Sequence, residues 1–139
     1  MKVVFDTVVF VRALINPKSR CGRLVFEHYA DYRLIISAPV AREILEVINR
    51  PELKAKYSSL NGVDMARVID LLGEAEAVEL GEIPPVSRDP KDNVFIATAL
   101  AAGAQYIVSE DEDLKVMGEY QGIKIVDTKT FLELIEGRS

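Results

Sequence analysis

Short runs of apolar residues recur along the chain, and most are followed by a segment with the spacing of a helix. The first run, Val3-Val4-Phe5, is continuous, without the polar alternation of a half-exposed strand. Continuous runs are typical of strands buried on both faces of a parallel sheet. Similar runs occupy residues 34–36, 106–108 and 123–126, with a weaker one at 77–80. The pattern therefore predicts five strands.

Helical segments fill most of the chain between these runs. They cover residues 8–15, 22–32, 39–49, 63–76, 90–102 and 128–136. Strand and helix alternate along most of the chain, with one extra helix pair in the middle, and this order predicts an α/β fold. We expect a three-layer α/β/α sandwich with a five-stranded, mostly parallel sheet. No repeat or linker interrupts residues 1–139, so a single domain is expected.

The composition narrows the class of protein. Hydrophobic residues make up 49% of the chain and charged residues 28%, which is ordinary globular usage and argues against a disordered chain. The net charge of −5 provides no broad positive field for a polyanion. Any nucleic-acid binding must therefore be local or assisted by a metal.

Cysteine usage and hydropathy bear on location. The single cysteine, Cys21, can form neither an internal disulfide nor a thiolate zinc site, which fits a reducing compartment. The longest apolar stretch, residues 3–14, is broken by Asp6, Thr7 and Arg12. It lacks both the length of a membrane span and the order of a signal peptide. We therefore expect a cytoplasmic protein that is not exported and has no membrane partner.

Acidic residues follow two of the predicted strands. Sites in open parallel sheets form beyond the carboxyl ends of the strands, and Asp6 and Asp111 both lie there. Asp6 also lies between two apolar segments, where a buried carboxylate is costly unless something cationic compensates. A simpler use of Asp6 is as the N-cap of the following helix. Because a cap can also be a ligand, Asp6 remains a candidate.

The predicted helix before Pro51 contributes another acid. At about 100° per residue, Glu43 lies about 60° from Val40 and borders the apolar stripe of this helix, whereas Glu46 lies about 120° from Val40 and points further toward water. Glu43 is therefore the candidate site residue of this helix. The alternative is a partly exposed glutamate paired with a neighbouring cation such as Arg50.

Further acids cluster near the end of the chain. Asp89 reads as a helix N-cap with Pro90 at the first helical position, and Asp92 then heads the buried stripe. The simpler interpretation of Asp92 is that it only complements the helix dipole. Residues 109–113 carry four acids in five positions, which is more often a solvated charge run.

Several other kinds of active site are disfavoured by the sequence, which leaves a metal site built from carboxylates. His28 is the only histidine, Cys21 has no base nearby, and no glycine-rich phosphate loop is present, so a triad, a thiol nucleophile and a nucleotide loop are disfavoured. Converging carboxylates need a counter-charge. Oxygen ligands without nitrogen or sulfur select Mg²⁺ or Mn²⁺, which can activate water and offset charge on a phosphoryl group.

These residues together resemble the PIN-domain nucleases, particularly the toxin-type PIN proteins of bacterial and archaeal toxin–antitoxin pairs. The resemblance covers nearly the whole chain in order. It is carried by Phe5-Asp6-Thr7, by Glu43 in the helix ending Asn49-Arg50-Pro51, by the run from Asp89 to Leu100, and by Ile107-Val-Ser-Glu-Asp111. It implies Asp6, Glu43, Asp92 and Asp111 as an acidic quartet, with Thr7, Ser109 and Asp113 supporting it. Val8 departs from the family pattern, which often has Asn or Ser there.

The resemblance also implies an activity and partners. It points to an endoribonuclease whose Mg²⁺ or Mn²⁺ is held chiefly by Asp6, Asp92 and Asp111, with Glu43 orienting water. Implied partners are an RNA substrate, an antitoxin protein and a second copy in a homodimer. Basic residues near the motifs would form an RNA-binding patch, chiefly Arg42, Arg88 and Lys91, with Arg50, Lys54 and Lys56 nearby.

Three other functions compete with this one. A phospho-acceptor receiver needs adjacent acids after the first strand and a lysine beyond the last, whereas Thr7 follows Asp6 and Lys124 lies inside its strand. A haloacid-dehalogenase-type phosphatase needs a second aspartate where Val8 stands. The third is a catalytically weakened PIN domain that binds nucleic acid or protein without cutting.

Overall fold

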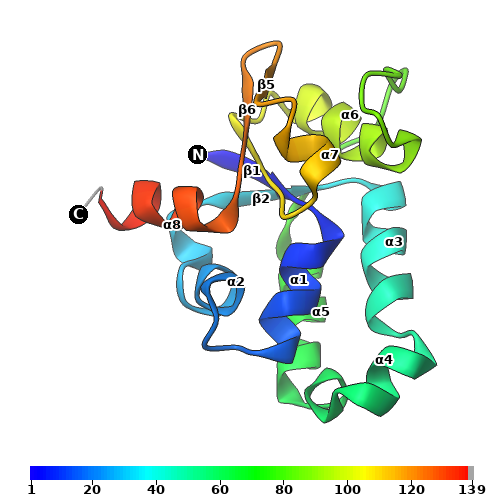
Figure 1. Ribbon diagram of the computed structural model, residues 1–139, viewed down its shortest axis with the longest axis vertical. Coiled ribbons are helices and arrows are strands. Elements are labelled where there is room, and N and C mark those ends of the chain that lie inside the picture. Colours follow the sequence, from blue (N-terminus) through cyan, green and yellow to red (C-terminus); the bar gives the residue numbers. More distant parts are fainter. Residues whose placement is uncertain (138–139) are drawn as a thin grey trace.

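A computed structural model describes residues 1–137 and shows a six-stranded sheet with helices packed around it (Figure 1). The strands are β1 (Lys2–Phe5), β2 (Arg33–Ile36), β3 (Glu76–Ala77), β4 (Tyr106–Val108), β5 (Glu119–Tyr120) and β6 (Ile123–Val126). They lie in the order β3-β2-β1-β4-β6-β5. All neighbouring pairs are parallel except β5 with β6.

The helices and short helical turns follow the strands as expected for an α/β fold. The α-helices are α1 (Thr7–Ile15), α2 (Arg20–Gly22), α3 (Ala38–Ile48), α4 (Pro51–Lys56), α5 (Val63–Glu74), α6 (Asn93–Ala102), α7 (Glu112–Lys115) and α8 (Thr128–Glu136). The turns are η1 (Arg23–Glu27, a π-helical turn), η2 (Tyr29–Asp31), η3 (Ser58–Asn61) and η4 (Pro90–Asp92). In Figure 1 the middle helices α3, α4 and α5 extend below the sheet.

The first strand lies at the centre of the molecule. β1 pairs with β2 on one side and with β4 on the other, and Val3, Val4 and Phe5 are fully buried. Rings of α1, α8 and the start of β2 pack on Phe5, with centroid distances of 5.8 Å to Phe10 and 6.4 Å to Phe131. α6 packs against β1, β2 and β4. The predicted three-layer α/β arrangement is confirmed.

The sheet differs from the prediction in one strand. It has six strands and is mixed, because residues 119–120 turn back along β6 as the short antiparallel edge strand β5. Two residues are too few to produce a hydrophobic period, so the pattern could not predict this strand. The turn that joins β5 to β6 contains Gln121 and Gly122, whose φ angles are positive, at 48° and 85°.

The helix predicted over residues 22–32 is wrong as one element. The chain instead forms α2, η1 and η2 in succession. α2 packs so closely on the preceding loop that a Cβ on Gly22 would lie 2.1 Å from the carbonyl oxygen of Pro17. Ser19 caps the start of α2 by accepting the amide of Gly22, and the chain after Gly22 continues as the π-helical turn η1.

No α-helix within residues 1–137 is both long enough and apolar enough to cross a bilayer.

Candidate active site: an acidic pocket at the carboxyl edge of the sheet

Asp6 begins the pocket, at the point where β1 ends and α1 starts. One carboxylate oxygen, Oδ1, accepts the amide of Val9 at 3.2 Å, so Asp6 is the predicted N-cap of α1. The other, Oδ2, accepts the Ser109 hydroxyl at 2.6 Å and the Glu110 amide at 3.2 Å. Only 3% of Asp6 is exposed. The carboxylate therefore ties the end of β1 to the loop that follows β4.

The loop after β4 carries the next acids. Ser109 is fully buried and its hydroxyl also accepts the Asp111 amide at 2.9 Å. Asp111 caps α7, with its Oδ1 accepting the amide of Asp113 at 2.8 Å. The acid run at 109–113 is thus ordered by its own hydrogen bonds instead of lying free in solvent.

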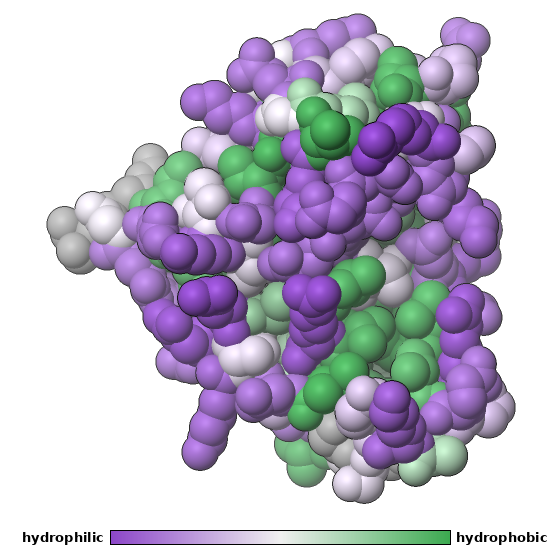
Figure 2. Space-filling view, in the orientation of Figure 1, coloured by the Kyte–Doolittle hydropathy of each residue, from purple (hydrophilic) through white to green (hydrophobic). Residues whose placement is uncertain are grey.

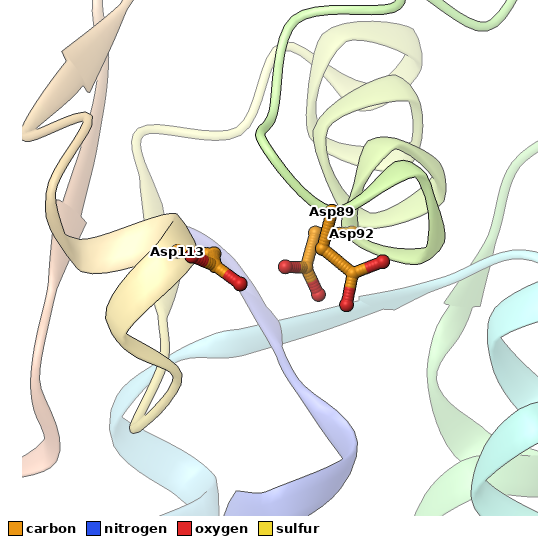
Figure 3. A group of neighbouring side chains, drawn as sticks. All are labelled: Asp89, Asp92 and Asp113. Atoms are coloured by element: carbon orange, nitrogen blue, oxygen red, sulfur yellow. The ribbon is translucent and has the colours of Figure 1, made fainter.

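A third segment brings two more carboxylates to the same place. Asp89 caps η4 by accepting the Lys91 amide at 3.0 Å, and Asp92 ends that turn. Carboxylate oxygens of Asp89, Asp92 and Asp113 lie within 4.8 Å of one another. Figure 3 shows Asp113 on α7 pointing across to Asp89 and Asp92, which come from the turn before α6. Asp6, Glu43 and Asp111 are outside this closest group.

Two carboxyl groups of the pocket, those of Asp6 and Asp92, have raised pKa values. Burial raises the pKa of Asp6 to about 6, although the hydrogen bonds from Ser109, Val9 and Glu110 oppose the rise. The pKa of Asp92 rises to about 7, first because of burial and then because of nearby negative charges. Those charges belong to Asp111, Asp89, Asp6 and Asp113, which indicates one electrostatically coupled pocket.

Asp92 has an unsatisfied atom. Its Oδ2 is buried and has no hydrogen-bond partner within the described residues. A buried carboxylate oxygen without a partner is costly, and a cation placed among the three carboxylates would remove that cost. The donor set consists of oxygens only, as Mg²⁺ and Mn²⁺ prefer. The residues present therefore fit a hard divalent cation.

Glu43 lies beside the pocket on α3. It is half-buried and accepts the hydroxyl of Thr7, the residue after Asp6. Glu46 is exposed and pairs with Arg50 at 3.0 Å, so the partner considered for Glu43 belongs to Glu46. The start of α3 is fixed to α6 through a buried hydroxyl pair, Ser37 to Thr98 at 2.8 Å. The helix bearing Glu43 is thus held against the helix that follows Asp92.

The basic residues predicted near the motifs have different surroundings. Arg88 donates to Asp113 Oδ1 at 2.8 Å, so it balances one carboxylate of the closest group. Arg42 and Lys91 are exposed, and neither side chain has a hydrogen bond or ion pair within residues 1–137. Arg88 and Lys91 flank Asp89 along the chain, at the edge of the pocket.

The sequence pattern did not predict the full roles of two residues, Asp89 and Asn93. It treated Asp89 as a cap, which it is, but a carboxylate has two oxygens and can also face a cation. It gave Asn93 no role, yet this buried side chain accepts the amides of Val86 and Ser87 at 3.3 and 2.8 Å. Asn93 thereby holds the loop that delivers Arg88 and Asp89. A polar residue on an otherwise apolar helix was the available signal.

Comparison with known proteins gives a family match. The sequence model of the PIN domain matches residues 2–113, a span that includes every acid of the pocket. The chain is also similar to an uncharacterized protein, MJ1680, of Methanocaldococcus jannaschii. The two are 28% identical over 130 residues, which covers 90% of this chain and 81% of that protein.

Two solved structures share the fold. PAE2754 from Pyrobaculum aerophilum has a TM-score of 0.59 and 13% identity, covering 99% of this chain and all of the other. VapBC2 from Rickettsia felis, solved bound to a DNA fragment from their promoter, has a TM-score of 0.59 and 12% identity, covering 90% of this chain and 97% of the other. At these identities the likeness is one of fold.

Proposed function

The chain belongs to the PIN-domain family, and from this premise we propose that it is a Mg²⁺- or Mn²⁺-dependent endoribonuclease. PIN domains are typically nucleases and generally use divalent metals. The observation that carries the proposal is the group of Asp89, Asp92 and Asp113, with oxygens within 4.8 Å and one buried oxygen unpartnered. Asp6 and Asp111 belong to the same coupled pocket.

The acids have distinct roles in this proposal. Asp6, Asp92 and Asp111 would hold the ion, and a cation there would compensate the burial that raises the pKa of Asp6 and Asp92. When bound, the divalent ion lowers the pKa of water and offsets charge on the phosphoryl group. Asp89 and Asp113, whose oxygens lie within 4.8 Å of an Asp92 oxygen, would add further oxygen ligands for the ion. Ser109 keeps Asp6 in place through its hydroxyl.

Glu43 orients the attacking water in this mechanism. Its Oε2 accepts the Thr7 hydroxyl, which leaves Oε1 to accept a proton from that water. Attack by water in line with the leaving 3′-oxygen breaks the P–O3′ bond, so the phosphate stays on the 5′-oxygen of the downstream fragment and the upstream fragment ends in a 3′-hydroxyl. The expected product therefore has a 5′-phosphate.

Substrate and partners follow from the same premise. We infer that Arg42, Arg88 and Lys91 guide RNA past the acidic pocket, since the net charge of −5 offers no general attraction. A role as the toxin of a toxin–antitoxin pair is supported by the shared fold with a chain of VapBC2. The corresponding partners are an antitoxin with a basic segment and a second copy of this chain. A small neighbouring reading frame whose product co-purifies with the chain would test the antitoxin.

Cleavage of single-stranded RNA tests the nuclease. Mg²⁺ or Mn²⁺ should support cleavage, EDTA should stop it, and Asp6→Asn and Asp92→Asn should each lower the rate by about 100-fold or more, since even partners one step beyond a metal ligand cost about 10–100-fold. Glu43→Gln should also slow cleavage.

Glu46→Gln is the matched control on the same helix, because Glu46 faces solvent and pairs with Arg50. Full activity in EDTA would refute the metal-dependent mechanism. RNA binding without any cleavage in Mg²⁺ would favour a binding module. Inactivation by Glu46→Gln but not by Glu43→Gln would reverse the assignment on α3.

A further inference from the structure

A cavity lined by several charged residues lies at the same edge of the sheet as the acidic residues. It has a volume of about 400 Å³ and is formed by the end of α1, by α2 and by the start of α8; we call it the α1–α2–α8 cavity. In Figure 1, α2 lies between α1 and α8, and Figure 2 shows hydrophilic side chains over this region. Its charged lining residues are Arg12, Arg20, Lys129, Glu110 and Asp127.

The two acids in this cavity are already engaged. Glu110 Oε1 accepts the amide of Thr128 at 3.1 Å, and its Oε2 lies 3.5 Å from Arg12. Asp127 caps α8 by accepting the amide of Thr130 at 2.8 Å. The Asp127 carboxylate also interacts electrostatically with Lys129, which contributes to lowering the pKa of Asp127.

Two of the three cations remain available. The side chains of Arg20 and Lys129 are exposed and make no hydrogen bond or ion pair within the described 137 residues. Arg12 is the third, with 56% of its side chain exposed and one contact at 3.5 Å among the five N–H donors of a guanidinium. Three cations thus face one cavity in a chain whose overall charge is −5.

One residue joins the cavity to the acidic pocket. The backbone amide of Glu110 donates to Asp6 Oδ2 at 3.2 Å, whereas its side chain lines the cavity. Asp6, Glu110 and Asp127 follow β1, β4 and β6 respectively, which lie side by side. A strand of nucleic acid lying along this edge would meet the acidic pocket and the cavity in turn.

We propose that the α1–α2–α8 cavity binds one internal phosphodiester of a single-stranded RNA, next to the bond that lies over the acidic pocket. The inference rests on the proposed nuclease function and extends it with a second binding point for the substrate. Arg20 and Lys129, whose side chains make no hydrogen bond or ion pair within the described residues, supply positive charge, and Arg12 adds donors. The ligand is the phosphate group, so the sequence of the bases is not read here.

The test measures the affinity of the full chain for a fluorescent single-stranded RNA over a range of salt concentrations. The Asp6→Asn background prevents cleavage. Adding Arg20→Gln and Lys129→Gln should weaken binding about tenfold, and the slope of log affinity against log salt should fall by about 0.7 for each phosphate that the protein no longer neutralises. The matched control is Lys18→Gln with Lys124→Gln, two exposed lysines that line neither site.

Further measurements distinguish an internal phosphodiester from a terminal or free phosphate as the ligand of the cavity. A neutral methylphosphonate at one internal position of the RNA should reproduce the weaker binding in the parent protein and have no effect in the Arg20→Gln, Lys129→Gln variant. The exchange Arg20→Lys with Lys129→Arg should retain binding, which shows that the weaker binding is not due to misfolding. Melting temperatures should agree among these variants.

Several results would overturn the inference. Equal affinities and equal salt slopes for the cavity and control variants would do so. Sensitivity to removal of a 5′-terminal phosphate alone, or binding of inorganic phosphate with no effect on RNA, would assign the cavity to a free or terminal phosphate. Because affinity is measured in a variant that does not cut, failure of wild-type cleavage is a separate result that bears on the proposed function.

Discussion

At the residue scale, the carboxyl group of Asp92 is buried and lies near other negatively charged carboxylates. The folded protein holds its proton with a pKa of about 7, whereas the ordinary value is 3.8. The folded state therefore binds more protons than the unfolded chain between these values. Stability should fall as the pH rises from about 4 through 7 and then level off.

The Asp92→Asn variant tests this dependence. In EDTA at pH 8 it should be more stable than the wild type by about 2 kcal/mol, which is the pKa shift converted at about 1.4 kcal/mol per unit and reduced for solvent screening. Below pH 3.8, where Asp92 is protonated in both the folded and the unfolded state, the two proteins should agree. Urea unfolding at several pH values measures the difference. Asp70→Asn, an exposed aspartate on α5, is the control and should follow the wild type. A difference in unfolding free energy between Asp92→Asn and the wild type that is the same at all pH values would contradict the raised pKa of Asp92.

Val8 is the residue that sets this chain apart from the family pattern. The structure shows how Asp6 is supported without a polar side chain there. Both oxygens of Asp6 already accept hydrogen bonds, from the Val9 amide and from Ser109 and Glu110. Strand ends and helix faces sufficed to propose Asp6 and Asp92. Which oxygens lie closest together depends on loop paths, which no hydrophobic period records.

At the element scale, the connection from α1 to α2 depends on a glycine. A Cβ on Gly22 would lie 2.1 Å from the Pro17 carbonyl oxygen, so Gly22→Ala must displace backbone. We expect a decrease of about 2 kcal/mol or more in the free energy of unfolding. Gly73→Ala is the matched control, because Gly73 lies in α5 with nothing within 4 Å of the added methyl group.

The control should change stability in the opposite direction. Alanine in a helix is favoured over glycine by about 0.5–1 kcal/mol, so Gly73→Ala should raise the midpoint of chemical unfolding. Denaturation by urea measures both variants. Equal effects of the two substitutions would show that the packing of α2 on Pro17 does not limit stability.

Elements long enough to show a hydrophobic period were predictable from the sequence, and shorter elements were not. The segments that became α1, α3, α5, α6 and α8 agree within a few residues, because each has an apolar face to bury. Residues 22–32 do not form one helix but end α2 and continue as η1 and η2, and β5 could not be predicted because it has two residues. Four-residue α7 was hidden within the acid run.

At the scale of the whole molecule, metal binding should be coupled to the release of protons. Near pH 6.5 the carboxyls of Asp6 and Asp92 are partly protonated, since their pKa values are about 6 and 7. Binding of Mn²⁺ must displace these protons. Calorimetry in two buffers of different ionisation enthalpy should show about one proton released at pH 6.5 and fewer at pH 8. Mn²⁺ should also raise the melting temperature.

Asp92→Asn supplies the comparison for this experiment. It should release fewer protons and gain less thermal stability, whereas Glu46→Gln should behave as the wild type. Proton release that is the same at both pH values would place the metal away from these carboxylates. EDTA should return the melting temperature to its starting value.

The position of β1 between β2 and β4 has a consequence for synthesis. Asp6 leaves the ribosome early, but the hydroxyl that fixes it belongs to a residue 103 positions later. At about 5–20 residues per second, roughly 5–20 s pass before that strand and the carboxylates of η4 and α7 can join it. A growing chain therefore lacks the assembled pocket while it is tethered to the messenger RNA that encodes it. Strand order alone keeps the acidic pocket unassembled until the segment that follows β4 has been synthesised.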